Sequence, residues 1–127
     1  MKKAFTMIEL IFVIVIIGIL SAVAVPKFAE TGKMAYASRA ESTVQALRSA
    51  ISTERQKRIL RGDISSDINT SAAAALLSYG LDSSWEESDN NTFTYTAPGT
   101  TATCAFDIEG GKLVKKTCDV ATGLDHL

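Results

Sequence analysis

Hydrophobic residues are distributed unevenly along this chain of 127 residues. No residue between Leu10 and Pro26 is charged, and residues 10–17 are all Leu, Ile, Phe or Val. As an α-helix rising about 1.5 Å per residue, the apolar segment from 5 to 25 is long enough to cross roughly 30 Å of hydrocarbon. Lys2 and Lys3 precede it, and positive residues stay on the cytoplasmic side of a membrane. The pattern therefore predicts one membrane-spanning helix with the rest of the chain on the outer side.

Further along, the apolar residues take on a one-sided spacing. Four of them recur at steps of four and three residues and so share one stripe of an α-helix. They are Ala40, Val44, Leu47 and Ile51. The helix is expected to continue to about residue 61 and to end before Gly62, with this stripe docked on a C-terminal sheet.

The remaining sequence predicts a short helix and a small sheet. Residues 63–70 are polar and turn-like, and 71–79 predict a helix capped by Ser71 and ended by Gly80. Strands are expected at 92–96, 103–108 and 113–118, because these segments are rich in β-branched and aromatic residues. Three apolar residues are expected to cover one side of the sheet: Leu76, Leu77 and Trp85.

The register of the last hairpin decides where its two cysteines lie. A three-residue loop at 110–112 would pair Glu109 with Leu113 and place Cys104 directly opposite Cys118. A two-residue Gly-Gly turn would offset the cysteines by one residue and make a bridge harder. A Cys104–Cys118 disulfide would close about fifteen residues, worth roughly 3 kcal/mol by loop entropy. We expect this disulfide, with two reduced core thiols as the alternative.

Two other interpretations of the N-terminal segment compete with a lasting membrane helix. The chain is too short to surround such a helix in a soluble core. A cleaved secretory signal is the stronger rival, since 22–24 reads Ala-Val-Ala and a mature chain would begin at Val25. Glu9 argues against it, because a carboxylate inside hydrocarbon costs about 2.5–3.5 kcal/mol at the centre, which a disposable signal has no reason to carry. The helical pattern beyond Pro26 argues against it as well.

The segment Lys3-Ala4-Phe5-Thr6-Met7-Ile8-Glu9-Leu10-Ile11 resembles the prepilin processing and methylation motif of type IV pilins and type II secretion pseudopilins. The resemblance implies cleavage between Ala4 and Phe5 and methylation of the new Phe5 amine. It also implies that Glu9 pairs with the N-terminal amine of a neighbouring subunit during assembly. The family usually has Gly where this sequence has Ala4.

The same resemblance implies a domain plan and a location. Residues 1–4 would be a prepilin leader, 5–26 a transmembrane and assembly helix, and 27–127 a periplasmic pilin-like domain. The expected fold class is α+β: a long N-terminal helix, transmembrane in its first half and amphipathic in its second, packed on a small antiparallel β-sheet at about 92–118. Pro26 is expected to kink the helix or to mark a segment that melts on assembly.

The implied partners are those of a pilin-like subunit. They are a prepilin peptidase, other pilin-like subunits, an inner-membrane assembly platform with its ATPase, and membrane lipid before assembly. The chain would be held in a bacterial inner membrane by a single span and would enter a periplasmic or surface filament. A cysteine pair near the C-terminus is also common in the family.

Charge argues against direct contact with nucleic acid. The formal net charge is −1. Four cations lie close together near the predicted helix end, and no aromatic residue interleaves with them to stack on bases. They are Arg55, Lys57, Arg58 and Arg61. We interpret them as a solvated end that complements the helix dipole.

Candidate chemistry is sparse. The one histidine, His126, lies beside a C-terminus expected to be flexible, and no Walker, Rossmann or zinc pattern is present. We therefore expect no catalytic residue, no enzymatic activity and no cofactor. Four carboxylates near the C-terminus match no calcium-loop spacing, so no metal site is predicted. They are Asp107, Glu109, Asp119 and Asp125.

Two glycosylation sequons fall in predicted loops. Asn69-Thr70-Ser71 has Asp67 two residues upstream, the extended form that some bacterial systems require, and Asn90 begins the second sequon. Asn69 is the candidate acceptor.

The sequence therefore predicts a structural subunit of a type IV pilin-like filament. The short globular domain favours a pseudopilin of a type II secretion system, which would serve protein transport. A competence pseudopilin for DNA uptake is the next alternative, followed by a surface type IV pilin and by a secreted single-domain binding protein.

Overall fold

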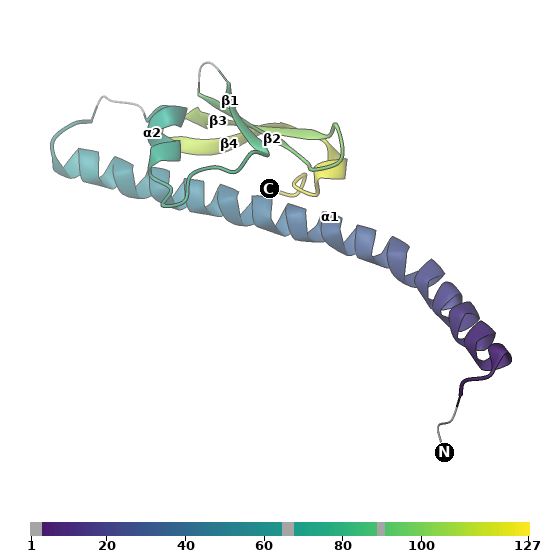
Figure 1. Ribbon diagram of the computed structural model, residues 1–127. Helices are drawn as coiled ribbons and strands as arrows, with labels where there is room; N and C mark the ends of the chain where they lie inside the picture. Colours follow the sequence, from purple (N-terminus) through teal and green to yellow (C-terminus); the bar gives the residue numbers. More distant parts are fainter. Residues whose placement is uncertain (1–3, 65–67, 89–90) are drawn as a thin grey trace. The chain divides into compact units, whose positions relative to one another are not determined.

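The computed structural model describes residues 4–64, 68–88 and 91–127. The predictions that concern Lys2, Lys3, Asp67 and Asn90 lie outside these residues. The chain divides into two compact units, residues 1–34 and residues 35–127. A single helix, α1 (Met7–Leu60), contributes to both units, and all the strands belong to the second (Figure 1).

Helix α1 contains 54 residues and confirms the long helix expected from the sequence. It remains helical on both sides of Pro26, although this proline donates no backbone hydrogen bond. At its end the amide of Gly62 donates to the Ile59 carbonyl at 3.0 Å and that of Asp63 to the Arg58 carbonyl at 3.0 Å. Gly62 has a φ of 83°, so the helix ends in a Schellman motif at the predicted glycine.

The second unit is a helix-on-sheet layer in which α1 lies along one face of the sheet (Figure 1). The predicted stripe is buried: Ala40, Val44, Leu47 and Ile51 are the buried residues of α1. Opposite them, alternate strand residues point inward, as the two-residue period of a strand requires. The largest of these inward-facing side chains are Trp85, Phe93, Tyr95 and Phe106.

The sheet has four antiparallel strands in the order β1-β2-β3-β4. They are β1 (Trp85–Ser88), β2 (Thr92–Thr96), β3 (Thr103–Glu109) and β4 (Lys112–Cys118). The last three match the predicted strands closely, whereas β1 was not predicted. Two adjacent carboxylates, Glu86 and Glu87, lower the strand propensity of that segment and conceal it. Trp85 is therefore part of the sheet, with its ring 5.1 Å from that of Tyr95, and does not cover it from outside.

The predicted register of the β3–β4 hairpin is right at the cysteines and wrong at the turn. Glu109 pairs with Lys112 across a two-residue Gly110–Gly111 turn, and Cys104 still pairs with Cys118. A β-bulge between Ala105 and Phe106 shifts the register by one residue, which compensates for the turn being one residue shorter than predicted. Because a bulge places two residues opposite one, it corrects the offset that the short turn creates.

The short helix is displaced from its predicted position. Helix α2 (Thr70–Ala75) is capped by Asn69, whose side chain accepts from the Ala72 amide at 2.9 Å, and not by Ser71. Asn is as good an N-cap as Ser, and its earlier position starts the helix one residue sooner. Leu77 packs against the core as expected.

One ion pair ties β3 to the bulged strand on the solvent face of the sheet. Lys116 Nζ lies 2.7 Å from Asp107 Oδ2, and the Thr92 hydroxyl donates to Asp107 Oδ1 at 2.6 Å. The hydrogen bond from Lys116, followed by that from Thr92, lowers the pKa of Asp107 below its ordinary 3.8. The hydrogen bond to Asp107 raises the pKa of Lys116 above 10.5.

The turn can be tested at Gly110, which has a φ of 56° and open space where a side chain would begin. Gly110→Ala should lower the free energy of unfolding by about 1 kcal/mol, because Ala is strained at this φ. Gly110→Asn should be close to neutral, since Asn-Gly is a favoured pair for a type I′ turn. Urea unfolding of the detergent-solubilised chain, followed by the fluorescence of buried Trp85, measures both. Equal stability of the Ala and Asn variants would contradict the assigned turn.

The Asp107 pair predicts a pH dependence of stability. A carboxyl with a lowered pKa in the folded state stabilises the fold above its ordinary value of 3.8 and loses that contribution as the pH falls through the lower folded value. Asp107→Asn should therefore flatten the loss of stability with acid below about pH 4. Glu86→Gln, which removes an exposed carboxylate that forms no ion pair among the described residues, is the control. Parallel acid profiles for wild type and Asp107→Asn would refute the assignment.

Candidate assembly site

The start of α1 is shaped by Thr6. Ala4, Phe5 and Thr6 precede the helix, and the Glu9 amide is directed at the Thr6 carbonyl, 3.1 Å away, and the Thr6 hydroxyl, 3.4 Å away. Thr6 thus occupies the N-cap position and Glu9 the third helical position, the spacing of a capping box. The sequence analysis included this Thr-x-x-Glu only within the family motif and missed its capping role. The geometry places the Glu9 carboxylate in the positive first turn of the helix.

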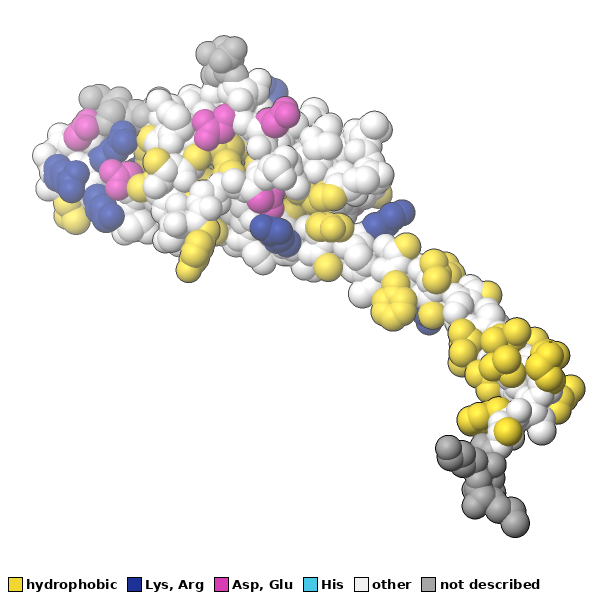
Figure 2. All heavy atoms as spheres, in the orientation of Figure 1, with side chains coloured by type: hydrophobic (Ala, Val, Ile, Leu, Met, Phe, Trp, Pro, Cys, Tyr) yellow, Lys and Arg dark blue, Asp and Glu magenta, His cyan; other side chains and the backbone are white. Residues whose placement is uncertain are grey.

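The apolar part of α1 has no protein cover in the described structure. Phe5 is 84% exposed and Leu10 59%, and no residue in the most apolar 18-residue stretch of the helix is buried. By length and composition this is a helix that could cross a membrane. Hydrophobic side chains gather densely over it in the space-filling view (Figure 2). A surface of this size needs lipid or other helices to cover it.

Small side chains on that surface leave room for another helix to pack closely against it. A methyl group added at Gly18 would meet nothing within 4 Å, and Ser21, Ala22 and Ala24 are also small. Small residues permit two membrane helices to approach closely. Glu9 is the one carboxylate among residues 5–25, and a carboxylate in such an apolar segment is stabilised by pairing with a cation.

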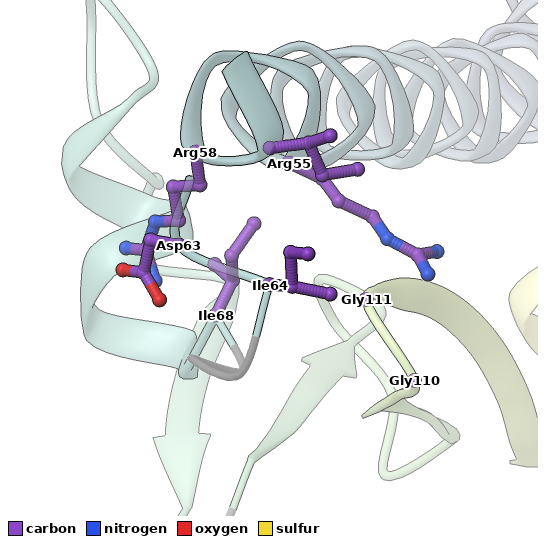
Figure 3. A pocket seen from close by; sticks show the side chains of 8 residues that line it. Arg55, Arg58, Asp63, Ile64, Ile68, Gly110 and Gly111 are labelled. Carbon is purple, nitrogen blue, oxygen red and sulfur yellow. The ribbon is translucent and has the colours of Figure 1, made fainter. Parts of the chain in front are cut away.

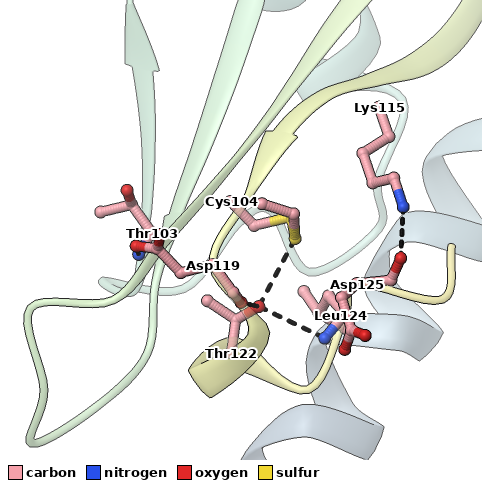
Figure 4. Close-up of a disulfide and its surroundings, with 8 residues drawn as sticks. Thr103, Cys104, Lys115, Asp119, Thr122, Leu124 and Asp125 are labelled. Carbon is pink, nitrogen blue, oxygen red and sulfur yellow. Dashed lines mark hydrogen bonds between the residues drawn. A yellow bond between two sulfur atoms is a disulfide. The ribbon is translucent and has the colours of Figure 1, made fainter.

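A disulfide joins Cys104 on β3 to Cys118 on β4, as predicted (Figure 4). It anchors the C-terminal segment that follows. The Asp119 amide donates to the Thr103 carbonyl at 3.0 Å, and Asp119 Oδ2 accepts from the Thr103 amide at 3.0 Å. Cys118 Sγ lies 3.4 Å from the Thr122 hydroxyl, which donates to the Asp119 carbonyl at 2.7 Å.

The C-terminus is therefore not the flexible end expected from the sequence. After a 3₁₀ turn, η1 (Val120–Thr122), Leu124 is fully buried and Leu127 packs against the core. His126 Nε2 lies 3.7 Å from Glu41 Oε1, while Lys115 Nζ donates to the Asp125 carbonyl. Apolar side chains inserted under the sheet fix this segment, a signal that Leu124 and Leu127 offered in the sequence.

The four C-terminal carboxylates considered for calcium do not form a cluster. Asp107 pairs with Lys116, Glu109 lies opposite Lys112, and Asp119 accepts a backbone hydrogen bond. Within residues 4–64, 68–88 and 91–127, no three His, Cys, Asp or Glu side chains are grouped so as to hold a metal ion.

Asn69 is the N-cap of α2 as well as the first residue of a sequon. The residue is exposed, but its side-chain oxygen is occupied by the Ala72 amide and by the Ser71 hydroxyl at 3.2 Å. Ser71 is the hydroxyl residue of the same sequon, so the folded sequon is held in the cap. Glycosylation at Asn69 stays a prediction.

A long apolar N-terminal helix that continues into a helix-on-sheet domain defines a pilin-like architecture. The family description "Prokaryotic N-terminal methylation motif" matches residues 1–25, the segment that contains Ala4, Phe5 and Glu9. No solved structure matches the chain.

Curated relatives match over part of the chain. The chain is 52% identical over 48 residues to "Type IV narrow pilus major component PilA5" of Thermus thermophilus, which covers 38% of this chain and 41% of that protein. It is 46% identical over 55 residues to "Fimbrial protein" of Moraxella nonliquefaciens, covering 43% and 36%, and 45% identical over 49 residues to "Fimbrial protein" of Pseudomonas aeruginosa, covering 39% and 32%. The match thus spans well under half the length of these relatives. The motif and these matches make this part of the chain similar to type IV pilins.

The two roles of Asn69 can be separated by substitution. Asn69→Ala should lower the free energy of unfolding by about 1 kcal/mol through loss of the cap. Asn69→Asp keeps a capping oxygen and should be near wild type in urea unfolding, although neither variant offers an amide acceptor for a glycan. If Asn69 carries a glycan in the native host, the mass increment disappears in both variants. Equal destabilisation of Ala and Asp variants would contradict the capping role.

Proposed function

We propose that this chain is a structural, non-catalytic subunit of a type IV pilin-like filament. The observation that carries the proposal is the uncovered apolar surface of α1 in a chain whose first 25 residues match the methylation motif. Lipid covers that surface before assembly, and the helices of neighbouring subunits cover it afterwards. Because burial between helices replaces burial in lipid, the filament keeps the apolar residues out of water at both stages.

Processing precedes assembly in this proposal. A prepilin peptidase removes residues 1–4 and the Phe5 amine is methylated. The subunit resides in the bacterial inner membrane with residues 27–127 in the periplasm, and an ATP-driven platform then extracts it. These partners follow from the family resemblance.

Glu9 sets the register between subunits. The new amine at Phe5 is a cation and Glu9 a carboxylate, and each removes the penalty that the other incurs at low dielectric. Thr6 supports this role by starting the helix at Met7, which keeps Glu9 in the first turn. Pro26 is the proposed point of a kink or of local melting, because it removes one hydrogen bond from α1.

Three kinds of filament suit such a subunit. The small domain of residues 35–127 favours a pseudopilin of a type II secretion system. The relatives described as pilus and fimbrial proteins favour a surface pilus, but each match covers less than half of this chain. A competence pseudopilus uses the same design. Deletion in the native host separates the three: lost protein secretion, lost surface filaments, or lost DNA uptake.

The first test combines intact mass and N-terminal sequence of the membrane-associated chain with recovery of sheared filaments. Wild type should begin with N-methyl-Phe5 and form filaments. Glu9→Ala should still be processed but should lose filaments by about tenfold or more, because the amine is left uncompensated. Glu30→Ala, the next carboxylate along α1, is the control and should assemble normally. A soluble chain beginning at Val25 would refute the filament subunit.

A further inference from the structure

We propose that residues 35–127 carry two complementary surfaces through which successive copies of this chain bind head to tail. One is a basic tip at the C-terminal end of α1. The other is an acidic edge formed by β1. The inference rests on the proposed filament function and names a contact within it that lies outside the apolar helix.

The basic tip combines exposed apolar and cationic side chains. Leu60 is 87% exposed and Ile64 is 85% exposed, although both are large aliphatic residues. Ile64 lines a cavity of about 130 Å³ together with Arg55, Arg58 and the Gly110–Gly111 turn (Figure 3). The tip is defined by Arg55, Lys57, Arg58, Leu60, Arg61 and Ile64. Apolar groups within a polar rim are typical of a protein–protein contact.

The tip has more positive charge than its own carboxylates balance. Its four cations face two carboxylates of the described residues, Glu54 and Asp63. Glu54 lies 3.5 Å from Arg58 and 3.9 Å from Lys57, and Asp63 lies beside Arg58 (Figure 3). In the part of the chain that the structure describes, no ion pair involves Arg55 or Arg61. Figure 2 shows dark-blue side chains gathered over this end of α1. These two cations therefore favour an acidic partner.

The acidic edge is the matching surface. Strand β1 is at the edge of the sheet and pairs only with β2, so one side of its backbone has no strand neighbour. Glu86 and Glu87 are exposed on it, and neither takes part in an ion pair among the described residues. They are the only two adjacent acidic residues in the chain. Magenta side chains lie over this edge, and others lie among the blue side chains at the end of α1 (Figure 2).

A second copy of the chain is the partner that fits both surfaces. The tip and the edge are different surfaces of one unit, so their contact is heterologous. A heterologous contact repeats from copy to copy, and unless its rotation closes a ring it generates an open helical assembly. Opposite charges also fix register and exclude wrong pairings. Nucleic acid fits the tip less well, because no aromatic side chain lies between its cations.

The test uses full-length chain in its native host and compares the recovery of sheared filaments. Arg61→Glu and Glu87→Lys should each lower it by about tenfold, because like charges then meet at the contact. The double variant carries both reversals and should recover most of the wild-type yield. Arg48→Glu, the same change on α1 away from the tip, should assemble normally. Urea unfolding of each variant checks that folding is retained.

A photoreactive residue at Leu60 provides an independent measurement. It should cross-link one copy to a peptide of another that contains β1, and Arg61→Glu should abolish that adduct. Single reversals that assemble like wild type, a double variant that stays defective, or an adduct mapping elsewhere would overturn the contact while leaving the filament function intact. Loss of double-stranded DNA retention by Arg61→Glu filaments of normal yield would also overturn it, in favour of a nucleic-acid surface. Wild-type chain that is processed but never polymerises would instead refute the filament function itself.

Discussion

The apolar surface of residues 5–25 is the constraint on which the rest of the molecule depends. Water cannot solvate a helix that is hydrophobic on all sides, and the described residues provide nothing to cover it. This segment therefore needs an apolar surrounding, which in the proposed function is first lipid and then other helices. The second unit does not have that need, since it buries its own stripe of α1 against a sheet. The chain thus combines a domain that buries its own apolar residues with a helix whose apolar residues must be covered by other molecules.

Short-range patterns predicted much of this fold. The stripe of Ala40, Val44, Leu47 and Ile51 identified the buried face of α1, since helix period and burial agree there. Gly62 identified the helix end, because a left-handed residue closes its last carbonyls. The strands after residue 91 followed from β-branched and aromatic residues. The disulfide was also expected, although from a register that is wrong at the turn and is restored by the bulge. The residues proposed for processing lay in the motif that the family comparison also matches.

What sequence reasoning missed depended on tertiary context. Strand β1 has weak intrinsic propensity and is held by pairing with β2 and by burial of Trp85. The bulge beside Phe106 is invisible in the sequence, because a two-residue turn and a three-residue loop around Gly110 are both plausible locally. Leu124 and Leu127 are two apolar residues near the chain end, but their packing against the core became evident only in three dimensions. The charged residues of the tip and the edge were visible in the sequence, but their placement on two different surfaces of the second unit was not.

Helix α1 has a mechanical consequence. It is helical from Met7 to Leu60, so the apolar half and the buried stripe belong to the same element. Tension applied at the apolar end would be transmitted to the packed domain through the helix, because no flexible loop separates the two parts. Pro26, which donates no backbone hydrogen bond, is the place where this helix would lengthen first. In the proposed filament, extensibility would then lie in the apolar half, while the domain that bears the disulfide keeps its shape under load.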